Sequence, residues 1–256
     1  MHKIERHTEI MRLLGEHRCL TVSDACEFLK CSDQTIRRDL QELEEQGKLK
    51  RVHGGAYIPD PDDRFAPVQL RARLVVEEKN HMAQLAADRF ISAGDVLMLD
   101  ASTTCNTLAR LILSSGPETT IITNSFATVS EFAGSGSGSV IIAAGGRFRR
   151  STASVEGPDA VNSISAHIAD KAFISCNAIS REFGLLDNYE YQRELRLAML
   201  SHARERYLLV DHTKFDDRAN VVICDFSKIS GVITDREPDD DWKEFFDGLG
   251  ISVIWQ

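Results

Sequence analysis

The stretch Ser32-Asp-Gln-Thr-Ile-Arg-Arg-Asp-Leu40 contains the residue types that read base edges in DNA. Glutamine pairs with adenine and arginine with guanine, while hydroxyl groups and helix N-termini bind phosphates. With Ser32 as its cap, a helix here would present these groups to the major groove from its first turns. The predicted DNA-contacting residues on this helix are Ser32, Gln34, Thr35, Arg37 and Arg38.

We expect Gln34, Thr35 and Arg37 to face DNA, and Arg38 to meet a phosphate or an internal carboxylate. The alternative is that both arginines are solvated helix charges paired with Glu42 and Glu45. A basic segment, Lys48–Ile58, follows and reads as two short strands with a turn at Gly54-Gly55. The predicted backbone or minor-groove contacts of this wing are Lys50, Arg51 and His53, although His53 fits a simple turn equally well.

Two further helices must position the predicted DNA-contacting helix and its wing. Apolar residues at helical spacing predict one over 3–17, and Thr21 with Asp24 predicts a capped second helix over 22–30. The second should bury Val22, Ala25, Phe28 and Leu29, and the third, ending at Gly47, should bury Ile36, Leu40 and Leu43. The pattern predicts a winged helix-turn-helix over 1–58, a Pro/Asp-containing linker over 59–74, and a second domain over 75–256.

The second domain alternates helices with short, wholly apolar runs, which is typical of a mainly parallel α/β sheet covered on both faces. A helix is predicted over 77–90, and others over 105–113, 129–133, 191–203 and 241–248. The strands are predicted at 96–99, 120–123, 140–144, 172–175, 207–210, 231–234 and 251–254. The segment 134–138 is expected to be a surface loop.

Polar residues follow several of these strands, at the edge where ligands of parallel sheets collect. Loops that lead into helix N-termini offer N–H groups and hydroxyls to an anion, although the hydroxyls would serve equally as helix caps. An arginine near 145–150 would pair with a phosphate or carboxylate, unless that cluster is only an exposed face. Lys214 is the other expected cation, and Asp211 is expected to bond ligand hydroxyls. The predicted effector-binding residues are Asp100, Ser102, Thr103, Thr104, Thr123, Asn124, Ser125, Gly145, Gly146, Arg147, Arg149, Asn177, Glu194, Asp211 and Lys214.

The 256 residues carry a net charge of −9, and its distribution limits how DNA is bound. Residues 1–57 hold ten basic and ten acidic residues, so the 20 basic and 29 acidic residues beyond them account for the whole excess. DNA contact should therefore be local, from a dimer or tetramer that binds two half-sites.

No apolar run could span a membrane, and no secretory signal is seen, so a cytoplasmic protein is expected. Six cysteines without a C-x-x-C pair predict reduced thiols and no zinc site.

The segment from Arg6 to Gly55, with Thr35-Ile-Arg-Arg-Asp-Leu40 and His53-Gly-Gly55, closely resembles the DeoR family of bacterial transcriptional regulators. The resemblance continues through Asp100-Ala-Ser-Thr-Thr104, Thr123-Asn-Ser125, Gly145-Gly146, Asp211-His-Thr-Lys-Phe215 and Ile233-Thr-Asp235. It implies a sensor domain related to sugar-phosphate isomerases, and a repressor of a carbohydrate or polyol catabolic operon. The implied partners are operator DNA and a sugar phosphate, polyol phosphate or related anion.

An active isomerase or deaminase with an attached DNA-binding domain is the competing hypothesis. Catalysis would need an acid and a base positioned near the carbonyl group of the sugar. The isomerases carry an Asp-Gly-Ala-Asp segment where this chain has Ser175-Cys-Asn-Ala-Ile179, which lacks a carboxylate. We therefore expect no catalytic residue, metal or cofactor, and a ligand that weakens operator binding. A protein that only makes structural contacts and binds no small ligand is a third class.

Overall fold

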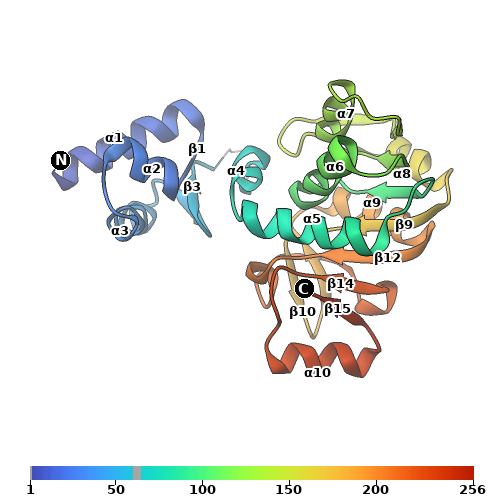
Figure 1. Ribbon diagram of the computed structural model, residues 1–256. Helices are drawn as coiled ribbons and strands as arrows, with labels where there is room; N and C mark the ends of the chain where they lie inside the picture. The colour runs from blue at the N-terminus through green and yellow to red at the C-terminus, as the bar shows by residue number, and fades with distance from the viewer. Residues whose placement is uncertain (1, 60–64) are drawn as a thin grey trace. The chain divides into compact units, whose positions relative to one another are not determined.

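The computed structural model describes residues 2–59 and 65–256, which form two compact units, 1–76 and 77–256 (Figure 1). The first contains helices α1 (Lys3–His17), α2 (Val22–Leu29) and α3 (Asp33–Glu45). Strands β1 (Cys19–Thr21), β2 (Lys50–Val52) and β3 (Gly55–Tyr57) form an antiparallel sheet in the order β1-β3-β2. This arrangement confirms the predicted winged helix-turn-helix and adds the unpredicted strand β1.

The helix caps predicted from the sequence are present in the first unit. Thr21 and Asp24 form the reciprocal capping box of α2, and the Ser32 hydroxyl accepts the N–H of Thr35 at the start of α3. Two details were predicted wrongly. Phe28 is 62% exposed, because it lies off the buried stripe of Val22, Ala25 and Leu29. Gly55 was predicted in the turn but opens β3, where its φ is not positive and a Cβ would lie 2.8 Å from a backbone oxygen of β1.

The linker predicted over 59–74 differs from the structure. Residues 60–64, which include most of the Pro/Asp stretch, lie outside the described residues. The prediction is wrong for Val68–Arg73, which form helix α4. The side chain of Leu70 on this helix is fully buried in a cluster with Cys19 and Tyr57, so α4 belongs to the folded first unit.

A buried carboxylate joins α1 to α3. Asp39 accepts two hydrogen bonds from the Arg6 guanidinium, at 2.7 and 3.0 Å, and lies 3.1 Å from Nε2 of His7. Burial by itself would raise the pKa of Asp39, but Arg6 and His7 lower it below its ordinary value. The carboxylate therefore stabilises the orientation of α3 on α1.

The second unit is built on a seven-stranded sheet in the order β15-β14-β12-β9-β4-β5-β6, in which every neighbouring pair is parallel (Figure 1). The predicted parallel α/β fold is confirmed. The strands are β4 (Val96–Leu99), β5 (Thr120–Thr123), β6 (Val140–Ala143), β9 (Ala169–Ile174), β12 (Ala203–Leu209), β14 (Gly231–Ile233) and β15 (Ser252–Ile254).

Helices cover both faces of this sheet. Leu97 and Leu99 of β4 pack with α5 (Val76–Phe90) and α6 (Thr103–Ser115), whereas Met98 belongs to the core on the opposite face. That second core includes side chains of α8 (Pro158–Ser165), α9 (Glu190–Ser201) and α10 (Asp240–Leu249). Helix α7 (Phe126–Ala133) follows β5. The alternation along β4 is that of a strand buried on both sides.

Two small antiparallel sheets and two 3-10 turns were not predicted. Strands β7 (Arg147–Arg149) and β8 (Ser154–Glu156) form a hairpin after β6. Strands β10 (Ala178–Ser180), β11 (Gly184–Asp187) and β13 (Val221–Cys224) form the other sheet, in the order β10-β11-β13. The turns are η1 (His212–Lys214) and η2 (Phe226–Lys228). The β10-β11-β13 sheet matters for the site, because Asp187 ends its middle strand.

Replacing Asp39 by asparagine should destabilise the first unit by about 3 kcal/mol, because it leaves the Arg6 charge unmatched. Hydrogen–deuterium exchange of α1 and α3 peptides in the full chain measures this loss. Because the folded pKa of Asp39 is lowered, its stabilisation is present above the unfolded pKa of about 4 and is lost as pH falls through the folded value. The exposed Glu16→Gln control should change stability by less than about 0.5 kcal/mol. Equal protection in D39N and wild type would contradict the role of Asp39.

Candidate functional site

The first turns of α3 present the predicted DNA-reading side chains to solvent. Gln34, Arg37 and Arg38 are exposed, and Thr35 is half-buried with its hydroxyl 2.9 Å from that of Ser32. Arg37 pairs with Asp33 one turn earlier, and Arg38 lies 3.4 Å from Glu42 while its side chain stays 81% exposed. The predicted pairing with Glu42 therefore holds for Arg38 only. Such exposed i,i+4 pairs are weak enough to be exchanged for DNA contacts.

The wing is attached to α3 by one carboxylate. Glu44 accepts hydrogen bonds from the backbone N–H and the Nε of Arg51, both at 2.8 Å. Lys50, Arg51 and His53 are exposed on β2 and the turn after it. The predicted basic residues of helix and wing thus lie on elements that share a direct contact. Their role in binding DNA remains a prediction.

In the second unit, all seven parallel strands place their carboxyl ends at one edge of the sheet. The predicted effector residues Asp100, Asn124, Gly145 and Asp211 lie in the loops that leave β4, β5, β6 and β12. Ser175 and Asn177 follow β9 in the same way. The structure therefore brings to a common edge residues that are more than 100 positions apart in the chain.

A buried arginine organises this edge. Arg196, on α9, has a side chain that is 7% exposed and donates from Nε to Asp100 at 2.7 Å. Its Nη1 donates to Asp187, whose side chain is 2% exposed. Burial by itself would lower the pKa of Arg196, but Asp187 and Asp100 together raise it. The guanidinium ties the loop after β4 to the end of β11.

Asp100 and Asp187, the two carboxylates that form a trio with Arg196, have further partners within the protein. Asp100 accepts the N–H groups of Ser102 at 3.0 Å and Ser175 at 3.3 Å. Asp187 accepts backbone N–H groups from the two residues that follow it and the side-chain amide of Asn177 at 3.3 Å. Asp100 is therefore engaged in holding the loops of the edge, which differs from a carboxylate left open to a ligand.

Neither Arg196 nor Asp187 is among the site residues predicted from the sequence. A signal was available. Gln192, Leu195, Arg196 and Met199 recur at helical spacing, so a charged residue stands within the buried stripe of an amphipathic helix. Gln192, the first residue of this stripe, donates to the Ser154 hydroxyl at 3.1 Å inside the protein.

Most predicted hydroxyls act within the fold. Ser102 caps α6 by accepting the N–H of Cys105 at 3.1 Å, and Ser125 caps α7 by accepting that of Thr128 at 3.2 Å. The Thr123 hydroxyl donates to a backbone oxygen of β4. Thr103 and Thr104 are buried in the first turn of α6. For Ser102 and Ser125, the capping alternative describes what the side chain does in this structure.

The two arginines predicted to bind the effector differ in whether their side chains have a partner among the described residues. Arg149 binds Glu156 through two contacts of 2.6 Å and lies over the ring of Tyr191, 4.3 Å from its centroid. Arg147 is exposed on the β7–β8 hairpin. Gly146 has a φ of +133°, and a Cβ there would lie 2.7 Å from the backbone oxygen of Glu156, so it serves close packing of that hairpin. Gly145 is exposed beside it, and Glu194 is exposed on α9.

Two groups at the edge stay available for a ligand. Lys214, on η1, is half-buried, and its ammonium group makes no ion pair or hydrogen bond with any residue in the described ranges. The Oδ1 of Asn124 is buried and lacks a hydrogen-bond partner in the same part of the chain. Asp211 instead turns its carboxylate back to the N–H of Thr213, at 3.0 Å, as the cap of η1.

The buried thiol of Cys176 and the two carboxylates around Arg196 are poorly placed to act as a nucleophile or a base. Burial raises the pKa of Cys176 to about 12, against the opposing effect of Arg196 and Lys214 nearby, so this thiol stays protonated at neutral pH. Asp100 and Asp187 are both ion-paired and hydrogen-bonded. Proton transfer would require breaking these contacts, which favours a binding site over a catalytic one.

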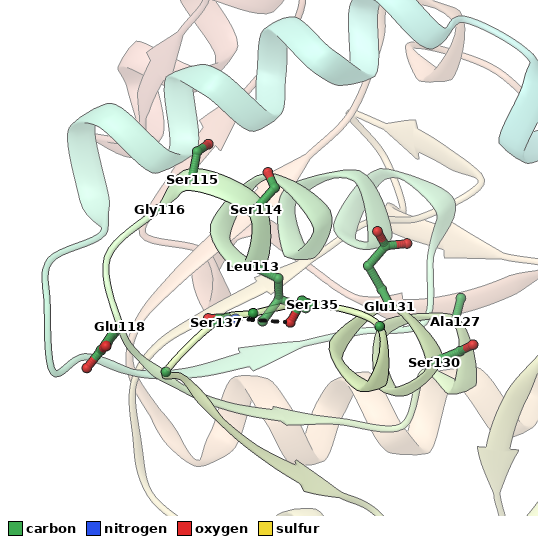
Figure 2. A pocket seen from close by; sticks show the side chains of 13 residues that line it. Leu113, Ser114, Ser115, Gly116, Glu118, Ala127, Ser130, Glu131, Ser135 and Ser137 are labelled. Carbon is green, nitrogen blue, oxygen red and sulfur yellow. Dashed lines mark hydrogen bonds between the residues drawn. The ribbon is translucent and has the colours of Figure 1, made fainter.

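A separate groove lies at the opposite edge of the sheet (Figure 2). Its lining includes Glu118 and Gly138, which precede β5 and β6, and serines from the ends of α6 and α7. It contains two glutamates and no basic residue, so it does not suit an anion. The carboxyl edge remains the candidate effector site.

Removing the Arg196 guanidinium should destabilise the second unit by about 3–5 kcal/mol, because Arg196→Ala leaves two buried carboxylates facing each other. Arg193 on the same helix is exposed and donates only to a backbone oxygen, so Arg193→Ala is the matched control, with an expected loss below about 1 kcal/mol. Urea unfolding followed by tryptophan fluorescence compares the two, since Trp242 is in the core of this unit. Equal midpoints for R196A and R193A would contradict the structural role of the trio.

Comparison with known proteins agrees with both units. The DeoR-like helix-turn-helix domain matches residues 6–62, and the DeoR C terminal sensor domain matches residues 75–236. No helix in the described residues is long and apolar enough to cross a membrane.

The chain is 30% identical to the HTH-type transcriptional repressor GlcR of Bacillus subtilis, over 99% of this chain and 96% of that protein. It is 29% identical to the glycerol-3-phosphate regulon repressor of Escherichia coli, over 93% of each. Among solved structures it is similar to ribose 5-phosphate isomerase A of Methanocaldococcus jannaschii, with 15% identity and a TM-score of 0.38 over 54% of this chain and 53% of the other. The sequence resemblance is thereby confirmed, and the chain belongs to the DeoR family of transcriptional regulators.

Proposed function

We propose that this protein is a transcriptional repressor of a carbohydrate or polyol catabolic operon, controlled by a small phosphorylated sugar or polyol. The observation that carries the proposal is the presence, in one chain, of a DNA-reading family domain and a sensor family domain. Two relatives that match almost the whole chain are named repressors, and one of them is named for a glycerol-3-phosphate regulon.

The DNA-binding part of the proposal is supported by the exposed residues of α3 and the wing. Gln34, Arg37 and Arg38 lie on the first turns of the helix, where base edges are read in helix-turn-helix proteins. Operators of such proteins consist of two half-sites, so the working form is proposed to be a dimer or tetramer, acting in the cytoplasm. Binding by one unit alone would be weak, because the rest of the chain is acidic.

The effector class is supported by Lys214, a cation at the carboxyl edge whose ammonium group has no carboxylate partner among the described residues. Lys214 follows β12 on a short turn and is half-buried, so its charge is partly shielded from water. An ammonium group in that setting binds a phosphate as a point charge. Neutral groups such as Asn124 are then available for hydroxyls, which together fits a small phosphorylated carbohydrate.

An effector changes operator affinity only by binding one arrangement of the protein better than another. We infer that the effector favours the arrangement with lower operator affinity, as catabolic control requires. The isomerase alternative is disfavoured, because relatives along the full length are named regulators and the carboxylates of the edge are locked in ion pairs.

Operator sequences selected from random DNA with the purified protein provide the first test. Arg37→Ala should weaken binding to the selected operator by about 1–3 kcal/mol and relax its sequence preference, if Arg37 reads a base. Arg12→Ala, which alters an exposed arginine of α1 paired with Glu9, is the control and should leave binding unchanged. Fluorescence anisotropy at fixed salt measures both. Unchanged affinity and preference in R37A would exclude Arg37 from base readout.

Lys214→Gln should leave operator binding intact and weaken binding of the phosphorylated effector about tenfold or more, because it removes a charge-assisted hydrogen bond. The control is Lys228→Gln, an exposed lysine on η2. Release of fluorescent operator DNA is titrated with glycerol 3-phosphate and with sugar phosphates. If K214Q responds like wild type to a compound that releases the operator, Lys214 does not bind the effector.

A further inference from the structure

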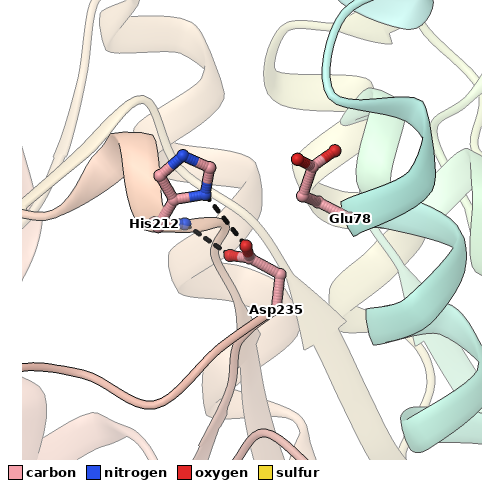
Figure 3. Close-up of side chains that lie close together, drawn as sticks. All are labelled: Glu78, His212 and Asp235. Atoms are coloured by element: carbon pink, nitrogen blue, oxygen red, sulfur yellow. Dashed lines mark hydrogen bonds and ion pairs between the residues drawn. The ribbon is translucent and has the colours of Figure 1, made fainter.

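Three side chains outside the predicted effector set come together in the second unit (Figure 3). Glu78 lies in the first turn of α5, His212 opens η1 after β12, and Asp235 follows β14. One ligand-type atom from each lies within 4.8 Å of the other two. Figure 3 shows the Glu78 carboxylate facing the His212 ring and the Asp235 carboxylate.

Asp235 is the fixed member of the group. Its side chain is 3% exposed and accepts the backbone N–H of His212 at 2.6 Å. Its second oxygen lies 2.9 Å from the Nδ1 of His212 and accepts the Nε of Arg236 at 3.0 Å. The His212 backbone and the Arg236 guanidinium therefore hold both oxygens of Asp235 in position.

Glu78 brings a second carboxylate to this place. The residue is half-buried, and its carboxylate forms no hydrogen bond or ion pair with the residues that the structure describes. Two carboxylates this close repel each other, and the repulsion is stronger in a partly buried site than in water. A cation between Glu78, Asp235 and the imidazole nitrogen would remove that repulsion.

We propose that Glu78, His212 and Asp235 bind one divalent transition-metal ion of the zinc type. One imidazole nitrogen and two carboxylate oxygens form a mixed donor set that suits Zn²⁺ and its neighbours better than the all-oxygen set of Mg²⁺ or Ca²⁺. Three protein ligands leave a fourth position for water or another small ligand. The ion would join the start of α5 to the ends of β12 and β14.

The geometry requires only local adjustment. Zinc–nitrogen and zinc–oxygen bonds of about 2.0–2.2 Å place tetrahedral ligand atoms roughly 3.3 Å apart. The Nδ1 of His212 and the Oδ2 of Asp235 are 2.9 Å apart, so they would separate by a few tenths of an ångström. The neutral imidazole would then carry its proton on Nε2, which frees Nδ1 for the metal.

The three donors include no cysteine and none of the residues proposed to contact the operator. They are at positions 78, 212 and 235, a spacing that matches no local metal motif, so the site could not be predicted from the sequence. His212 and Lys214 share the turn η1, so an ion held by His212 would also restrain the turn that carries Lys214.

The test is a Co²⁺ titration of the full-length protein after dialysis against a chelator. Wild type should bind one Co²⁺ per chain with visible d–d bands of a nitrogen and oxygen site, and Zn²⁺ should displace it. The six free thiols are an internal check, since a thiolate site would add a strong near-ultraviolet sulfur-to-metal band. A spectrum with that band, or no saturable binding, would overturn the proposal.

Variants locate the site. Glu78→Gln and His212→Ala should each weaken Co²⁺ binding about tenfold or more, because losing a direct ligand costs at least as much as losing one that only supports it. Glu77→Gln, the exposed neighbour on α5, is the matched control and should bind like wild type. Without metal, E78Q should melt at the same temperature as wild type or higher, because the repulsion is relieved. Wild-type affinity in both E78Q and H212A would overturn the proposal.

Discussion

A guanidinium buried between two carboxylates cannot turn to water, so its neighbours must supply both charge and geometry. Arg196 imposes this condition on the carboxyl edge of the sheet, because Asp100 comes from the loop after β4 and Asp187 from the end of β11. Asp100 in turn holds the N–H groups of Ser102 and Ser175, so the loops after β4 and β9 are fixed together. Lys214 and Asn124, the residues proposed to bind the ligand, lie in the loops after β12 and β5, at this same edge.

The DNA-reading unit uses the same device on a smaller scale. Asp39 stands in the middle of α3 and points inward to Arg6 and His7, while Gln34, Arg37 and Arg38 of the same helix point to solvent. Glu44 then holds Arg51 of the wing against α3. In both units a buried or half-buried carboxylate fixes the element that carries the exposed functional groups, and those groups keep only weak contacts that a ligand can replace.

The parts of the fold that follow local rules were predictable from the sequence. The Thr21 and Ser32 caps, the apolar stripe of α3 and the buried run of β4 each depend on residues within one helix or strand. Contacts between distant segments were not predictable in this way. Arg196 meets a carboxylate 96 positions away, and the antiparallel strands β10, β11 and β13 pair across a gap that no local pattern reveals. Phe28 was misplaced because an apolar residue was taken as buried without regard to its angle around α2.

We propose that the carboxyl edge, organised by Arg196 and open at Lys214, binds a small phosphorylated carbohydrate. The most direct measurement is the melting temperature of the full-length protein with paired compounds, each phosphorylated sugar or polyol beside its unphosphorylated form. Binding to the native state raises the melting temperature by mass action. We expect a rise with at least one phosphorylated compound and none with its unphosphorylated partner. A rise with only unphosphorylated compounds, or with no member of the set, would contradict it.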